Sequence, residues 1–251
     1  MSALFDLSGR VAVVTGANTG IGRGLAVALA EAGADVALVG RTPAEETADK
    51  IRGEGRRAAI IGADLSTIEP VQEVVERTVA ELGGLDILVN NAGIIRRADA
   101  LEFSEEDWDA VIDTNLKSVF FLSQAAARHM VGQGRGKIIN IASMLSFQGG
   151  VRVPSYTASK SGVAGLTRLL ANEWAARGIN VNAIAPGYIA TNNTAALQAD
   201  ETRNRQIMER IPAGRWGQPS DLGGAAIFLA SSASDYIHGH ILAVDGGWLA
   251  R

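Results

Sequence analysis

Short apolar runs alternate with stretches of helical periodicity along almost the whole chain. The runs are rich in Val and Ile, as strands buried on both faces are, and the stretches between them repeat apolar residues at helical spacing. This alternation favours a parallel sheet with helical crossovers. We therefore predict an α/β fold, a doubly wound parallel sheet with helices on both faces and right-handed connections. Seven strands are predicted, at residues 11–15, 36–39, 58–63, 85–90, 137–142, 180–185 and 241–244.

The predicted helices include residues 22–32, 69–82, 108–130, 158–177 and 221–231. No linker, repeat or low-complexity tract interrupts the 251 residues, so we predict a single domain, 1–251. One long irregular segment, 187–219, is rich in Asn, Thr, Gln and Arg. A segment of that length inside a compact domain is usually a lid or a binding loop, and we interpret it as a substrate loop. The simpler alternative is a pair of small surface helices.

The composition excludes several classes of function. Lys and Arg total 23 against 27 Asp and Glu, and the net charge of -4 gives no reason to expect nucleic acid. No apolar run of about eighteen residues occurs, so no membrane span is expected, and the first residues lack the layout of a secretion signal. The absence of Cys excludes disulfides, thiolate catalysis and Cys-ligated metals, and we predict no metal site. A cytoplasmic location is the default.

A glycine-rich turn follows the first predicted strand. The segment Thr15-Gly16-Ala17-Asn18-Thr19-Gly20-Ile21-Gly22 leads from that strand into a helical stretch. Glycines permit a tight turn and let the backbone approach a pyrophosphate, which then lies at the positive end of the helix. A glycine triplet alone is weak evidence, but a position between strand and helix is the context that a dinucleotide site requires.

Three later strand ends extend this candidate site. In an open α/β sheet, ligands bind beyond the carboxyl ends of the strands. Small or polar residues at these ends therefore fit an adenosine and its ribose lying across them. Asp64 is also a candidate N-cap for the element that follows. The residues at the ends of the second, third and fourth strands are Arg41, Asp64, Leu65, Asn90, Asn91, Ala92 and Gly93.

Ser143, Tyr156 and Lys160 form a candidate proton-transfer group. Tyr156 and Lys160 are four residues apart in a helical stretch, so their side chains share one face. A phenol ionises near pH ~10 and is a poor base at neutrality, but an ammonium group beside it favours phenolate. Tyr156 could then exchange a proton with an alcohol or a carbonyl, while the Ser143 hydroxyl, arriving from a separate strand, holds the substrate oxygen.

Together these motifs resemble those of the classical short-chain dehydrogenase/reductase family over the whole length of the chain. The resemblance implies a Rossmann fold and an enzyme that moves hydride between a nicotinamide cofactor and a secondary alcohol or ketone. The residues that carry it are Thr15, Gly16, Gly20, Gly22, Asn90, Asn91, Ala92, Gly93, Asn115, Ser143, Tyr156, Lys160, Pro186 and Gly187.

The resemblance also implies a role for each site residue. Tyr156 would donate and accept the proton, Ser143 would orient the substrate oxygen, and Lys160 would lower the Tyr156 pKa and bind the nicotinamide ribose. Asn115 would hold a water that relays protons to Lys160. Cofactor contacts would come from Gly16, Asn18, Thr19, Gly20, Ile21, Gly22, Arg41, Asp64, Leu65, Asn91, Ala92, Gly93, Tyr156, Lys160, Pro186, Gly187, Ile189 and Thr191.

A narrower resemblance covers much of the later sequence. Residues 91–104, 142–150, 153–160, 185–193 and 243–251 are similar to the bacterial 2-deoxy-D-gluconate 3-dehydrogenase group, also described as 2-dehydro-3-deoxy-D-gluconate 5-dehydrogenases. This implies a sugar-acid substrate, whose carboxylate suits the planar fork of an Arg side chain. Among Arg96, Arg97 and Arg152, we expect Arg152 or Arg96 to bind it. Lesser candidates, for the sugar hydroxyls, are Gln148, Asn192 and Asn193.

The end of the second predicted strand bears on the choice between NAD and NADP. An acidic residue there would bind the ribose hydroxyls of NAD and repel the 2′-phosphate of NADP, but this chain has Gly40-Arg41. Against NADP, Thr19 stands where NADP-using relatives often carry a basic residue, and the narrower group is generally linked to NAD. Both cofactors stay open, and Arg41 favours NADP slightly.

Alternative functions also stay open. One is a different enzyme of the same family, a gluconate 5-dehydrogenase or a 3-oxoacyl carrier-protein reductase. Another is a non-catalytic scaffold that senses dinucleotides, although such a protein need not keep Asn115, Ser143, Tyr156 and Lys160 together. The resemblance further implies a homotetramer built through 108–130, 158–177 and the last strand. Those helical stretches are apolar on more than a narrow stripe.

Overall fold

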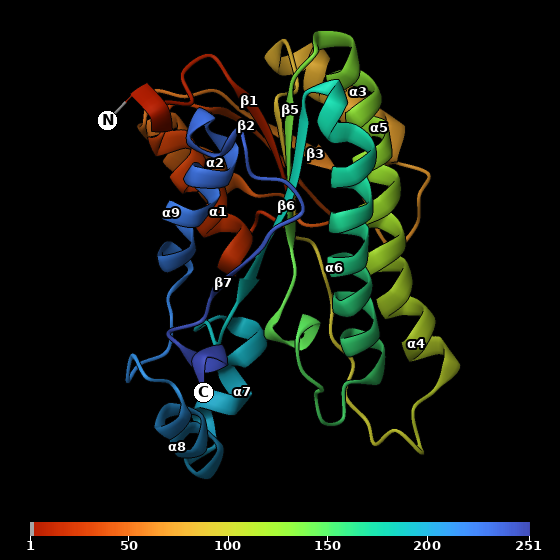
Figure 1. Ribbon diagram of the computed structural model, residues 1–251, viewed down its shortest axis with the longest axis vertical. Helices are drawn as coiled ribbons and strands as arrows, with labels where there is room; N and C mark the ends of the chain where they lie inside the picture. The colour runs from red at the N-terminus through yellow and green to blue at the C-terminus, as the bar shows by residue number, and fades with distance from the viewer. Residues whose placement is uncertain (1–2) are drawn as a thin grey trace.

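The computed structural model describes residues 3–251 and contains a seven-stranded sheet (Figure 1). The strand order is β3-β2-β1-β4-β5-β6-β7, and all neighbouring strands are parallel. The order reverses at β1, which pairs with β2 on one side and with β4 on the other. The predicted doubly wound sheet is confirmed. Its strands are β1 (Val11–Thr15), β2 (Asp35–Gly40), β3 (Ala58–Gly62), β4 (Ile87–Asn90), β5 (Gly136–Ile141), β6 (Ile179–Pro186) and β7 (Ile241–Val244).

Helices pack on both faces of the sheet (Figure 1). Successive side chains of a strand point to opposite faces, so one strand feeds two cores. In β1, Ala12 and Val14 belong to the first core, and Val11 and Val13 belong to the second. The helices are α1 (Gly20–Glu31), α2 (Glu45–Gly53) and α9 (Gly223–Ala230) on the first core, α3 (Val71–Leu82), α5 (Ser118–Gln133) and α6 (Pro154–Trp174) on the second, and α4 (Glu105–Ile112), α7 (Ala195–Ala199) and α8 (Glu201–Arg210) nearer the ends.

The predicted helix 108–130 is divided in the structure. It consists of the end of α4, a five-residue π-helix at Asp113–Lys117, and most of α5. A π-turn widens the helix by one residue and rotates the side chains that follow it. Asn115 lies within this turn and is fully buried.

The segment 187–219 follows directly on β6 and forms the two short helices α7 and α8. The simpler alternative, a pair of small helices, therefore describes it. The Asp200 carboxylate begins α8 by accepting hydrogen bonds from the Thr202 and Arg203 amides, each at 3.0 Å. Figure 1 shows both helices beyond one end of the sheet. Within residues 3–251, no helix has the length and apolar character needed to cross a membrane.

Candidate active site

The turn after β1 fits only glycine at two positions. Gly16 has φ +66°, a left-handed conformation that side chains disfavour. A Cβ on Gly22 would lie 2.2 Å from the Gly16 carbonyl oxygen and 2.5 Å from Asn91 Nδ2. Asn91 itself donates to the Thr15 carbonyl at 2.8 Å, which ties the end of β4 to the end of β1. The glycine turn, the start of α1 and the β4 end thus form one close-packed unit.

The start of α1 is available to an anion. In the described structure the Thr19 side chain makes no capping hydrogen bond, so it leaves the first N–H groups of the helix as donors for a ligand. These amides and the helix dipole favour a phosphate group. A cavity of about 360 Å³, here called the glycine-loop cavity, lies against this helix end. These residues therefore fit the phosphates of a dinucleotide.

Many of the predicted cofactor residues meet at the glycine-loop cavity. Arg41, Asp64 and Leu65 lie at the ends of β2 and β3 instead, outside its lining. Pro186, Gly187 and Ile189 line a second cavity described below. The residues that line the glycine-loop cavity include Gly16, Asn18, Thr19, Gly20, Ile21, Gly22, Asn91, Ala92, Gly93, Tyr156, Lys160, Thr191, Asn192 and Asn193.

Asn115 reaches the same region from the π-helix. Its Oδ1 accepts from the Ile94 amide and its Nδ2 donates to the Ile94 carbonyl, both at 2.8 Å. The side chain thereby pairs with both peptide groups of one residue in the segment after β4. In this structure the Asn115 side-chain amide is hydrogen-bonded to Ile94. The predicted water relay stays a prediction.

Tyr156 and Lys160 lie one turn apart on α6, with the ammonium nitrogen 5.6 Å from the centre of the phenol ring. Lys160 Nζ donates to the Ile141 carbonyl at the end of β5, at 2.6 Å. Burial lowers the Lys160 pKa to about 8. Burial also raises the pKa of the Tyr156 phenol, and the Ser143 hydroxyl and the Arg97 guanidinium oppose that rise. The predicted lowering of the Tyr156 pKa by Lys160 stays a prediction.

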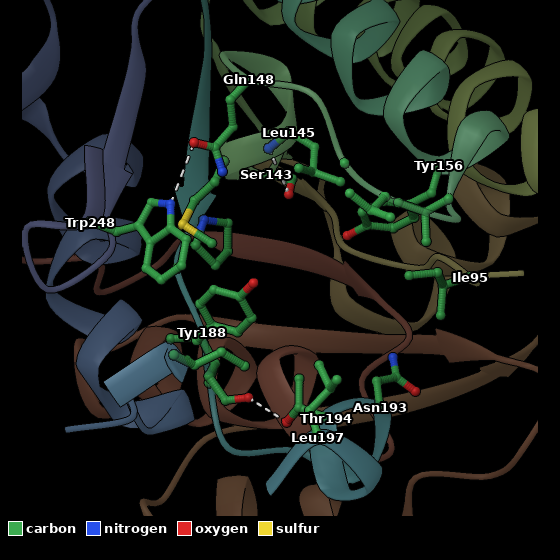
Figure 2. Close-up of a pocket in the computed structure, with 18 of the residues that line it drawn as sticks. Ile95, Ser143, Leu145, Gln148, Tyr156, Tyr188, Asn193, Thr194, Leu197 and Trp248 are labelled. Atoms are coloured by element: carbon green, nitrogen blue, oxygen red, sulfur yellow. Dashed lines mark hydrogen bonds between the residues drawn. The ribbon is translucent and has the colours of Figure 1, made fainter. Parts of the chain in front are cut away.

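Ser143 stands opposite Tyr156 at the end of β5. Its Oγ accepts from the Leu145 amide at 3.1 Å, beginning a short 3₁₀ turn at Met144–Ser146. Ser143 and Tyr156 both line a cavity of about 550 Å³, here called the α8 cavity because a face of α8 forms part of its wall. Figure 2 shows the two side chains on the wall of this cavity. Tyr156 lines both cavities and so stands where they meet.

The predicted carboxylate-binding arginines lie elsewhere. Arg96 pairs with Asp107 at 3.0 Å and Arg152 pairs with Asp99 at 3.2 Å, and neither lines the described cavities. The expectation that one of them meets the substrate is therefore not supported by their placement. Arg97, the third candidate, lines both the α8 cavity and the glycine-loop cavity, and Gln148 and Asn193 also reach the α8 cavity.

Sequence reasoning missed a charged face of the α8 cavity. Arg203, Gln206, Ile207 and Arg210 line it from α8. Their spacing of three, four and seven residues places them on one helix face, a signal that could have been found in the sequence. Trp248 also lines this cavity; it lies in the segment 243–251 of the narrower resemblance, but no site role was predicted for it. In the described part of the chain, no group of three or more His, Asp or Glu residues could hold a metal ion.

Known proteins resemble the chain over its full length. The family model described as "Enoyl-(Acyl carrier protein) reductase" matches residues 16–249. A 2-dehydro-3-deoxy-D-gluconate 5-dehydrogenase of Escherichia coli is 64% identical over 98% of both chains. Two crystal structures with bound NADP are also similar. One, described as a 2-deoxy-D-gluconate 3-dehydrogenase of Agrobacterium tumefaciens, is 60% identical over 99% of both chains, with a TM-score of 0.93.

The second, described as an NAD(P)-dependent gluconate 5-dehydrogenase of Beutenbergia cavernae, is 53% identical, with a TM-score of 0.95. The alignment covers 99% of this chain and 100% of that one. The chain belongs to the short-chain dehydrogenase/reductase family of oxidoreductases.

Proposed function

We propose that the protein is an NADP-dependent dehydrogenase that interconverts a secondary alcohol and a ketone on a deoxy-sugar acid. The observation that carries this proposal is the position of Tyr156 at the meeting of the two cavities. A proton donor there reaches a substrate in the α8 cavity and a nicotinamide in the glycine-loop cavity at once. The relatives named above act, by their descriptions, on deoxygluconate or gluconate, and two of them bind NADP.

The residues of the chain would manage the proton. A bound nicotinamide supplies the hydride exchange with the substrate carbon. In the direction of oxidation, the Tyr156 phenolate takes the hydroxyl proton, and in reduction the phenol returns a proton to the carbonyl oxygen. The Ser143 hydroxyl orients that oxygen by hydrogen bonding. Lys160 and Arg97 bring positive charge near the phenol, which favours the phenolate against the burial that disfavours it.

The charge of the α8 cavity supports an anionic substrate. Arg97, Arg203 and Arg210 line it, and no Asp or Glu is among the described residues of its wall. None of the three guanidinium groups pairs with a carboxylate within residues 3–251. The acyl chain of a fatty-acyl substrate is uncharged and does not match such a wall. We therefore prefer a sugar acid over a 3-oxoacyl carrier-protein substrate.

Turnover of sugar acids tests the proposal. We expect reduction of nicotinamide with 2-deoxy-D-gluconate or 2-dehydro-3-deoxy-D-gluconate, followed by absorbance. Tyr156→Phe should lower kcat by about a thousandfold, the scale of general acid–base catalysis, without weakening NADPH binding. Tyr236→Phe is the control, because Tyr236 is 99% exposed. A parent protein inactive on all sugar acids and ketones, or an equally active Tyr156→Phe variant, would contradict the proposal.

The choice of NADP rests on Arg41. Arg41 follows β2 and lies near Asp64. Hydrogen bonds from Ser66 lower the pKa of the Asp64 carboxyl most, and the charge of Arg41 lowers it further. An exposed guanidinium at this strand end suits the 2′-phosphate. Arg41→Ala should lower kcat/KM for NADP by about tenfold and leave that for NAD nearly unchanged. Arg52→Ala, which removes an exposed arginine paired with Asp49 on α2, is the control. A parent that strongly prefers NAD would contradict this choice.

We also propose one cytoplasmic domain, with 187–219 as its substrate loop, assembled as a homotetramer. Support for the loop comes from its contribution of Asn193, Arg203 and Arg210 to the α8 cavity. Support for assembly comes from Trp108 on α4 and Leu169 on α6, which are 40% and 46% exposed. Large apolar side chains that are exposed on a helix surface suit burial in an interface between subunits. Light scattering should give the mass of four chains.

A further inference from the structure

Two N–H donors converge on one neutral oxygen at an end of the α8 cavity. Gln148 Oε1 accepts from Trp248 Nε1 at 3.4 Å and from Arg210 Nη2 at 3.5 Å. Both distances are at the long limit of a hydrogen bond. Charged donors bind a carboxylate oxygen at shorter distance and with roughly twice the strength of a neutral acceptor. The Gln148 amide therefore occupies a position that an anionic oxygen would fill better.

The donors at this position are held in place from three segments of the chain. The Arg210 guanidinium stacks on the Trp248 ring, with its central carbon 4.0 Å from the ring centre. The Trp248 ring is 5% exposed and packs against Tyr188, with 4.8 Å between the ring centres. The Arg251 guanidinium donates from Nε to the Arg210 carbonyl at 3.2 Å. Stacking fixes the orientation of the planar guanidinium fork, which favours recognition of a carboxylate.

This cluster lies across the cavity from the reacting group. Figure 2 shows Gln148 and Trp248 on one side of the cavity and Tyr156 on the other. Arg97, in contrast, lies beside the phenol, because its charge acts on the Tyr156 pKa. If the substrate carboxylate bound Arg97, the carbon adjacent to that carboxylate would face Tyr156. A carboxylate at Arg210 would present a carbon further along the sugar chain.

We infer that Gln148, Arg210 and Trp248 form the subsite for the substrate carboxylate, and that this subsite selects which hydroxyl reaches Tyr156. The inference rests on the proposed function and deepens it. Arg210 forms the charge-assisted hydrogen bond, and Trp248 Nε1 donates a second one. Gln148 moves its amide oxygen aside and donates a hydrogen bond from Nε2 to the second carboxylate oxygen. With one end of the acid fixed there, a carbon remote from the carboxylate faces Ser143 and Tyr156.

The decisive variant is Gln148→Glu. It places a permanent carboxylate between Arg210 and Trp248, where it occupies both donors and repels the substrate. We expect KM for the sugar acid to rise by about tenfold or more, and KM for the uncharged sugar alcohol of the same length to change little. Arg210→Ala should have the same effect. Arg205→Ala is the matched control, because Arg205 is an exposed arginine of the same helix outside the cavity wall.

The position of the new ketone is a second readout. The parent should yield one ketone from a sugar acid, as seen by NMR of the product, and Arg210→Ala should yield a mixture. NADPH affinity and melting temperature, equal to those of the parent, show that the variants are folded. Equal KM changes for acid and alcohol, or a large acid-specific change in Arg97→Ala and none in Arg210→Ala, would overturn the subsite. A parent without sugar-acid turnover would instead overturn the proposed function.

Discussion

Lys160 carries its ammonium group where burial disfavours charge. The residue is 5% exposed, and its described hydrogen bond goes to the Ile141 carbonyl, a neutral partner. Its pKa falls to about 8 for this reason. At neutral pH the group is still mostly protonated, so the site keeps its positive charge beside Tyr156 at a cost in stability.

That cost should depend on pH. The unfolded chain holds the Lys160 proton up to about its ordinary pKa of 10.5, whereas the folded protein releases it near 8. Between these values the unfolded state binds more protons, so stability from this group rises with pH. Relative to Lys160→Met, the parent should gain about 2 kcal/mol of unfolding free energy between pH 7 and pH 9.5. Urea unfolding at both pH values measures it, and a constant difference would show that burial leaves the Lys160 pKa unchanged.

At this scale the sequence identified the residue types of the site but not all of their partners. Ser143, Tyr156 and Lys160 follow from a motif and fixed spacing, and the structure places Ser143 just after β5 and the other two on α6. Arg96 and Arg152 were preferred because they are close in sequence to the site. Their guanidinium groups pair with Asp107 and Asp99, and a pairing between distant residues leaves no mark in a local pattern.

Among the elements, the turn between β1 and α1 has the least freedom. Gly22→Ala would place a methyl group against the Gly16 carbonyl and the Asn91 amide, so one of them must move. We expect a loss of about 2 kcal/mol in stability and a large loss in NADPH affinity. Gly224→Ala is the control, since an added Cβ there meets nothing within 4 Å, and it should be neutral or slightly stabilising. Calorimetry and cofactor titration measure both, and equal behaviour of the two variants would contradict the steric argument.

Element types were more predictable than their ends and interruptions. All seven predicted strands exist, and the continuous apolar runs of β1, β2, β4, β5 and β6 match strands that are buried almost throughout. The π-helix at Asp113–Lys117 was not predicted, since the apolar residues of 108–130 were interpreted as one continuous helix. α2 was not among the predicted helices. Its buried residues are Thr47, Ala48 and Ile51, of which only Ile51 is large and apolar. Such a narrow apolar face gives a weak signal.

Across the whole molecule, the candidate site gathers at the carboxyl ends of the strands. The glycine turn follows β1, Asn91 follows β4, Ser143 follows β5 and Gly187 follows β6. Parallel strands end on the same edge, so this gathering could be predicted from sequence order. The contribution of Trp248 could not, because it depends on how the chain after β7 packs against α8.

The unpaired cations of the α8 cavity have a consequence for how the protein is handled. Among the described residues, the wall of this cavity includes three guanidinium groups and no Asp or Glu, so phosphate or citrate from an ordinary buffer should compete with the substrate. Raising ionic strength from 0.01 to 0.15 M shortens the screening length about fourfold, and kcat/KM for a sugar acid should fall. For an uncharged alcohol it should stay level. Rates recorded in different buffers would then differ without any change in the protein.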